Sequence, residues 1–144
     1  MPGIIVGIDG SDRSRQALEW AVNEAAVRHA PLTVLTVHQV LASYWGGPVL
    51  ADQDLTKRAG EAARDETDIL LEKFGEEERP PSVTVLAVTG VPAEELLDAA
   101  ADADMIVVGA RGAGGFKRLL MGSVCTQVTH HAHCPVVVIP ADNT

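Results

Sequence analysis

The stretch that decides the fold is Met105-Ile106-Val107-Val108-Gly109-Ala110-Arg111-Gly112, followed after nine residues by Gly122-Ser123. A short apolar run, typical of a buried strand, ends in a glycine-rich segment, and a helical pattern starts where that segment closes. Glycine lets the backbone adopt positive φ and lets bare N–H groups approach a ligand closely. A helix N-terminus adds unpaired amides and the positive end of a dipole. The order of strand, glycine-rich loop and helix therefore predicts an anion-binding site.

The charges around this loop point to a polyphosphate. Arg111, Lys117 and Arg118 are all basic, although the chain as a whole has a formal net charge of −9. Positive charge concentrated on an acidic protein favours a bound anion. The acidic balance also argues against nonspecific binding to nucleic acid or to an anionic membrane surface.

Composition and periodicity extend the α/β assignment to the whole chain. The 144 residues are 47% hydrophobic but only 3% aromatic, so the core must consist of Val, Ile, Leu and Ala, as in parallel sheets covered by helices. No linker or internal repeat interrupts the pattern, which predicts a single domain over residues 1–144. The expected strands are Ile4–Ile8, Leu32–Val40, Ser82–Val88, Met105–Val108 and Pro135–Ile139. The expected helices start at Ser11 or Asp12 and stop at Pro31, span Gln53–Phe74, start at Gly90-Val91-Pro92, and start at Ser123.

A second unusual turn, Asp9-Gly10-Ser11, follows the first expected strand. In open α/β sheets ligands bind beyond the carboxyl ends of the strands, where the strand order reverses. If the first and fourth strands are neighbours, Asp9 faces the glycine-rich loop. Its carboxylate could accept ribose hydroxyls, hold a hydrated Mg²⁺, or simply form the turn. The motifs GxxxxGK[ST] and GxGxxG are absent, which argues against a P-loop enzyme and a dinucleotide oxidoreductase.

The spacing of Gly109, Gly112, Gly122 and Ser123 resembles that of the universal stress protein family, whose nucleotide-binding members carry G-x-x-G, nine residues and G-[ST]. The resemblance covers essentially the full length. It includes three further segments, Val6-Gly7-Ile8-Asp9-Gly10-Ser11, Gly90-Val91-Pro92 and Cys134-Pro135-Val136-Val137-Val138.

This resemblance implies a fold, a ligand and an assembly. The fold is an open five-stranded parallel sheet of order 3-2-1-4-5 with helices on both faces, and the assembly is a homodimer formed through the final strand, residues 136–139. The ligand is ATP or a related adenine nucleotide, with or without Mg²⁺. Asp9 and the backbone around Val37 would contact the adenosine. The phosphates would lie on Gly109, Gly112, Gly122, Ser123 and Val124. Arg111 is not fixed by the pattern, so at most an electrostatic role is expected.

The leading functional hypothesis is a cytoplasmic regulatory protein that binds ATP during stress. A slow ATP hydrolase is an alternative, in which Asp9 is the only well-placed carboxylate. Cyclic AMP as the preferred ligand and a ligand-free interaction module are further alternatives. No signal peptide or run of about 20 apolar residues is evident, and Cys125 and Cys134 suggest small buried residues in a reducing compartment.

Two groups of side chains have competing interpretations. His130, His131 and His133 suggest a metal site, but adjacent helical residues point in different directions, so cations stabilising a helix C-terminus are the favoured interpretation. Tyr44 and Trp45 follow the second strand at the expected ligand edge. They could cover the adenine or merely pack on the domain.

Overall fold

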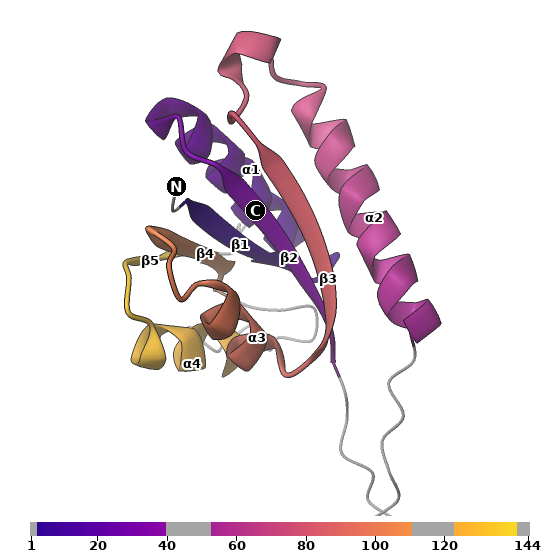
Figure 1. The fold of residues 1–144 in the computed structure, drawn as a ribbon, viewed down its shortest axis with the longest axis vertical. Helices are drawn as coiled ribbons and strands as arrows, with labels where there is room; N and C mark the ends of the chain where they lie inside the picture. The colour runs from indigo at the N-terminus through magenta and orange to yellow at the C-terminus, as the bar shows by residue number, and fades with distance from the viewer. Residues whose placement is uncertain (1–2, 40–52, 111–122, 141–144) are drawn as a thin grey trace, which may run out of the picture.

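The structure, a computed structural model, describes residues 3–39, 53–110 and 123–140. Strands and helices alternate along these residues, and the five strands form one sheet (Figure 1). The strands are β1 (Ile4–Ile8), β2 (Leu32–Gln39), β3 (Val83–Gly90), β4 (Met105–Gly109) and β5 (Val136–Ile139). The helices are α1 (Asp12–Arg28), α2 (Gln53–Leu71), the short 3₁₀ helix η1 (Glu76–Glu78), α3 (Pro92–Ala99) and α4 (Ser123–His131).

The sheet is parallel, and its order β3-β2-β1-β4-β5 confirms the expected topology. The chain builds outward from β1 to β3 and then crosses to β4 on the other side of β1. The strand order therefore reverses between β1 and β4. All five carboxyl ends meet at one edge, which is where α1, α3 and α4 begin.

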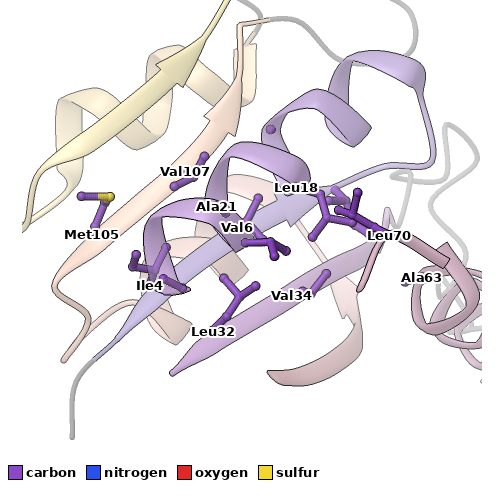
Figure 2. Packing of buried hydrophobic residues seen from close by; sticks show 14 residues of the cluster. Ile4, Val6, Leu18, Ala21, Leu32, Val34, Ala63, Leu70, Met105 and Val107 are labelled. Carbon is purple, nitrogen blue, oxygen red and sulfur yellow. The ribbon is translucent and has the colours of Figure 1, made fainter. Parts of the chain in front are cut away.

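The helices cover both faces of the sheet, and alternate strand residues supply two cores. Ile4 and Val6 of β1 face α1 and α2, where Leu18 and Leu70 join them (Figure 2). Ile5 faces α3 and α4 on the other side, in a cluster with buried side chains of those helices. This double coverage explains why the strands are near-continuous apolar runs.

Helix α1 begins as expected and ends earlier than expected. Ser11 is its N-cap and accepts a hydrogen bond from the backbone N–H of Ser14. Its C-terminus was expected at Pro31, but the helix ends at Arg28 because His29 adopts the left-handed conformation, with φ 53° and ψ 41°. The expectation that Pro31 ends the helix was therefore wrong, because the helix ends three residues before the proline.

Two other boundaries move by two residues or more. The second helix was expected to run to Phe74, but α2 ends at Leu71, and Lys73 and Phe74 instead donate backbone hydrogen bonds three residues back, to Leu70 and Leu71. The third strand was expected to end at Val88, but β3 continues to Gly90, which pairs with Gln39. Pairing with a distant strand decides this end, and local sequence does not encode it.

Among the residues that the structure describes, no helix is both long enough and apolar enough to cross a membrane.

Candidate functional site

The turn between β1 and α1 brings Asp9 to the carboxyl edge of the sheet. Gly10 has φ +85°, a value that favours glycine, and it turns the chain from the strand into the helix. Asp9 is exposed, and its Oδ1 accepts hydrogen bonds from the backbone N–H of Ser11 at 2.9 Å and from Ser11 Oγ at 2.5 Å. Its carboxylate is thus held against the helix N-terminus.

Val37 lies beside this turn. The β1–β2 register pairs Ile8 with Thr36, so Val37 is level with Asp9. The half-buried Val37 side chain packs on the α3–α4 side of the sheet, and Val37 pairs with Val88 of β3. The backbone of β2 and the Asp9 turn are therefore neighbours at this edge.

Gly109 lies at the same edge, on the other side of β1. The β1–β4 ladder ends with the pair Val6 and Val107, so β1 and β4 each continue for two residues beyond it. Counting on in this register places Gly109 level with Ile8. The next residue, Ala110, is buried and donates its backbone N–H to Ile139 of β5 at 2.8 Å.

Helix α4 begins at Ser123, on the edge where β4 ends, because it connects two parallel strands. Ser123 is exposed, and the half-buried Val124 packs on the α3–α4 core. Ser123 is the first helical residue, so its backbone N–H and that of Val124 are among the four donors that a helix N-terminus leaves unsatisfied within the helix.

The structure thus brings Asp9, Val37, Gly109, Ser123 and Val124 to one edge, at the reversal of strand order. This edge combines a carboxylate, a strand backbone and a helix N-terminus. Such groups can accept hydroxyls, contact a flat ring and receive an anion, respectively. Several expected contributors lie outside the described residues: Gly112, Gly122, Arg111, Lys117, Arg118, Tyr44 and Trp45.

The three histidines lie away from this edge. His130 and His131 form the last turn of α4, and with His133 they line an open groove of about 710 Å³ between the C-terminal ends of α3 and α4, together with Asp98. The described part of the chain contains no group of three His, Cys, Asp or Glu side chains arranged to hold a metal ion.

Sequence reasoning missed Ser14 in this region. Its side chain is buried, and its Oγ accepts a hydrogen bond from the backbone N–H of Asp9 at 3.2 Å. The available signal was the spacing Ser11-x-x-Ser14, which matches the positions of a helix capping box with serine in place of the usual acidic or amide residue.

Comparison with known proteins identifies the family. Residues 2–140 match the Universal stress protein family. A universal stress protein of Mycolicibacterium smegmatis is 35% identical over 144 residues, which cover 98% of this chain and 49% of that protein. The chain thus spans about half the length of the first curated relatives it matches.

Solved structures agree with this assignment. UspA from Lactobacillus plantarum is 30% identical, with a TM-score of 0.74 over 96% of this chain and 97% of that chain. The universal stress protein from Archaeoglobus fulgidus in complex with dAMP is 26% identical, with a TM-score of 0.59 over 96% of this chain and 98% of that chain. From the family match, the sequence identity and the shared fold, we conclude that this chain belongs to the universal stress protein family.

Proposed function

We propose that this chain binds an adenine nucleotide, ATP in particular, at the carboxyl edge of the sheet between β1 and β4. The observation that carries this proposal is the position of Asp9, Val37 and Gly109 on one edge, at the reversal of strand order. The binding would be regulatory, as part of a stress response. The chain covers about half the length of its first curated relatives, so any activity of the whole protein is also a proposal.

Two elements would receive the adenosine. The Asp9 carboxylate accepts hydrogen bonds readily, as its two bonds from Ser11 illustrate, and ribose hydroxyls are donors of the same kind. The backbone around Val37 lies one strand away, level with Asp9, where it could contact the edge of the base. The Archaeoglobus fulgidus relative solved with dAMP supports an adenine nucleotide as the ligand class.

The phosphates would lie on the other side of β1. Gly109 ends β4, and the first amides of α4, at Ser123 and Val124, are suited to an anion because the helix itself gives them no acceptor and because of the helix dipole. The glycines Gly112 and Gly122 would complete this phosphate site. The basic side chains between them favour a triphosphate over a monophosphate, and Mg²⁺ could accompany it.

Little or no hydrolysis is part of the proposal. A hydrolase needs a group that positions the attacking water, and usually a carboxylate that binds Mg²⁺. The Asp9 carboxylate already accepts two hydrogen bonds on Oδ1, which suits it to hold hydroxyls in place. A robust rate of ATP hydrolysis that Asp9→Asn abolishes would contradict this part of the proposal.

Titration with ATP tests the site. We expect saturable binding to the unmodified chain and at least a ten-fold weaker affinity in the double variant Gly122→Val, Ser123→Ala, because a side chain at residue 122 blocks close approach of a phosphate. Gly75→Val is the matched control, since Gly75 precedes η1, far along the chain from the proposed phosphate site. Unchanged ATP affinity in the double variant would refute the site. Tighter binding of cyclic AMP than of ATP would redirect the ligand assignment.

The assembly and compartment are also proposed. Strand β5 lies at the edge of the sheet, where its outer backbone groups can pair with another strand. We expect two copies to associate through residues 136–139. A cytoplasmic location fits the two cysteine thiols, Cys125 and Cys134, among the described residues.

A further inference from the structure

The turn that carries Asp9 is held by hydrogen bonds that link Asp9, Ser11 and Ser14. Ser11 Oγ donates to Asp9 Oδ1 and accepts from the backbone N–H of Ser14 at 3.2 Å. Ser14 Oγ donates to the backbone carbonyl of Ser11 at 3.0 Å and accepts from the backbone N–H of Asp9 at 3.2 Å. Each serine thus contacts both Asp9 and the other serine.

This arrangement differs from the usual capping box in a way that concerns Asp9. In that motif the third helical residue reaches back to the N–H of the N-cap residue. Here Ser14 occupies that position but reaches further, to the N–H of Asp9. The N–H of Ser11 is then satisfied by the Asp9 carboxylate. The helix cap and the orientation of the carboxylate therefore depend on each other.

Burial makes Ser14 the fixed end of this set. Ser14 is 5% exposed, whereas Asp9 is exposed and Ser11 is half-buried. The hydrogen bonds from Ser11 restrict the rotamer of the exposed Asp9 carboxylate and the turn that carries it. Fixing it before the ligand arrives removes an entropy cost from binding.

We propose that Ser14 is a positioning residue that acts through Ser11 and Asp9 to give the site its preference for ribose over deoxyribose. This inference rests on the proposed nucleotide site and adds to it the origin of sugar specificity. A site built around a hydrogen bond to a hydroxyl discriminates against the analogue that lacks it, provided that the acceptor is held in place. Removing the Ser14 hydroxyl releases the N–H of Asp9 and loosens the acceptor without deleting it.

The test compares the dissociation constants of ATP, 2′-deoxy-ATP and 3′-deoxy-ATP by calorimetry. The variants are Ser14→Ala, Ser11→Ala and Asp9→Ala, and the thermal midpoint of each is recorded. Thr67→Val is the matched control, because Thr67 is a buried hydroxyl on α2 that donates to the carbonyl of Ala63 at 2.7 Å and is not part of the Asp9 turn. The Thr67→Val variant also removes a hydrogen bond of a buried hydroxyl, but it leaves the Asp9 turn intact.

We expect the unmodified chain to prefer ATP over at least one deoxy analogue by roughly ten-fold, the size of one hydrogen bond to a charged group. Asp9→Ala should abolish this ratio, Ser14→Ala and Ser11→Ala should reduce it about three-fold or more, and Thr67→Val should preserve it. If Ser14→Ala does not fold, Ser11→Ala tests the positioning role, because it removes hydrogen bonds of the same turn at a residue that is less buried than Ser14.

The two proposals fail in different ways. If the unmodified chain prefers ribose and loses that preference with Asp9→Ala but keeps it with the serine variants, the positioning role is refuted and the nucleotide site stands. If the unmodified chain binds ATP without any preference for ribose, the positioning role is refuted as well. If no nucleotide binds at all, the proposed function fails, and the inference fails with it.

Discussion

Gly7 of β1 and Leu96 of α3 are in contact because Gly7 has no side chain. A Cβ placed on Gly7 would lie 2.9 Å from Leu96 Cδ1 and 3.1 Å from Leu96 Cδ2. Leu96 is buried in the cluster between the sheet and helices α3 and α4. The glycine thus sets how closely α3 packs on β1, the central strand that leads into the Asp9 turn.

Gly7→Val should therefore destabilise the fold by about 1–3 kcal/mol, because the added side chain displaces a buried leucine from a filled core. Chemical denaturation followed by circular dichroism measures the change. Gly75→Ala is the control, since the nearest atoms to a Cβ there lie 4.0 Å away and Gly75 has φ −64°, so its effect should stay within about 0.5 kcal/mol. Equal effects from the two substitutions would contradict this packing role.

His29→Gly should stabilise the protein by about 0.5–1 kcal/mol, because His29 adopts a left-handed conformation that costs a residue with a Cβ more than it costs glycine. The measurement is the thermal midpoint, which should rise by roughly 1–4 °C. His29→Ala removes the imidazole but keeps the Cβ, so it should bring no such gain. A lower midpoint for His29→Gly would mean that the side chain contributes more than the backbone strain costs.

The two thiols should react slowly in the folded protein. Burial raises the pKa of the Cys125 thiol. The pKa of Cys134 is raised first by burial and then by the nearby Asp104 carboxylate, and a hydrogen bond from the backbone of Ile106 partly opposes the rise. Since the thiolate is the reactive form, alkylation by iodoacetamide at pH 7.5 should be much slower in the native state than in denaturant.

These pKa shifts also make the free energy of unfolding depend on pH. The folded protein retains thiol protons at pH values where the unfolded chain, with thiol pKa values near 8.5, has released them. The associated stability is present below about pH 8.5 and is lost as the pH rises through the higher folded-state values. The single variants Cys125→Ala and Cys134→Ala assign the effect to each site. Rapid alkylation of both thiols at pH 7.5 in the native state would contradict these shifts.

Strand β5 should become protected from hydrogen exchange when the protein associates. Its four residues are half-buried, and it forms one edge of the sheet. On dilution, light scattering should show a dimer dissociating, and the outward-facing amides of residues 136–139 should lose protection together with it. The edge strand β3 is the internal control, since its exchange should not depend on concentration. A concentration-independent monomer would refute the proposed dimer.

Most strands and helices could be predicted from the sequence because they depend on local patterns. The apolar runs Ile4–Ile8 and Met105–Val108 are buried on both faces, and the Ser11 cap has the expected chemistry. The order of the strands came from the resemblance to a family, since periodicity alone does not specify neighbours. The structure confirms that order.

The remaining features depend on contacts that the sequence does not display. The end of β3 is set by pairing with β2, and the end of α1 is set by His29 in the left-handed conformation, which few residues other than glycine adopt. At the candidate site, Asp9 could be singled out from its turn, but the role of Ser14 could not. Its hydroxyl acts on a backbone N–H five residues earlier, a link that appears only once the turn is folded.

The most direct test of the nucleotide proposal is to denature a sample of the purified protein and to identify any released nucleotide by chromatography and mass spectrometry. A second sample, folded and freed of bound nucleotide, is titrated with ATP. We predict that ATP is released in near-stoichiometric amount, or that ATP binds saturably with a dissociation constant below about 1 mM. No released nucleotide together with no saturable binding of ATP or cyclic AMP would contradict the account and would favour the alternative of a ligand-free interaction module.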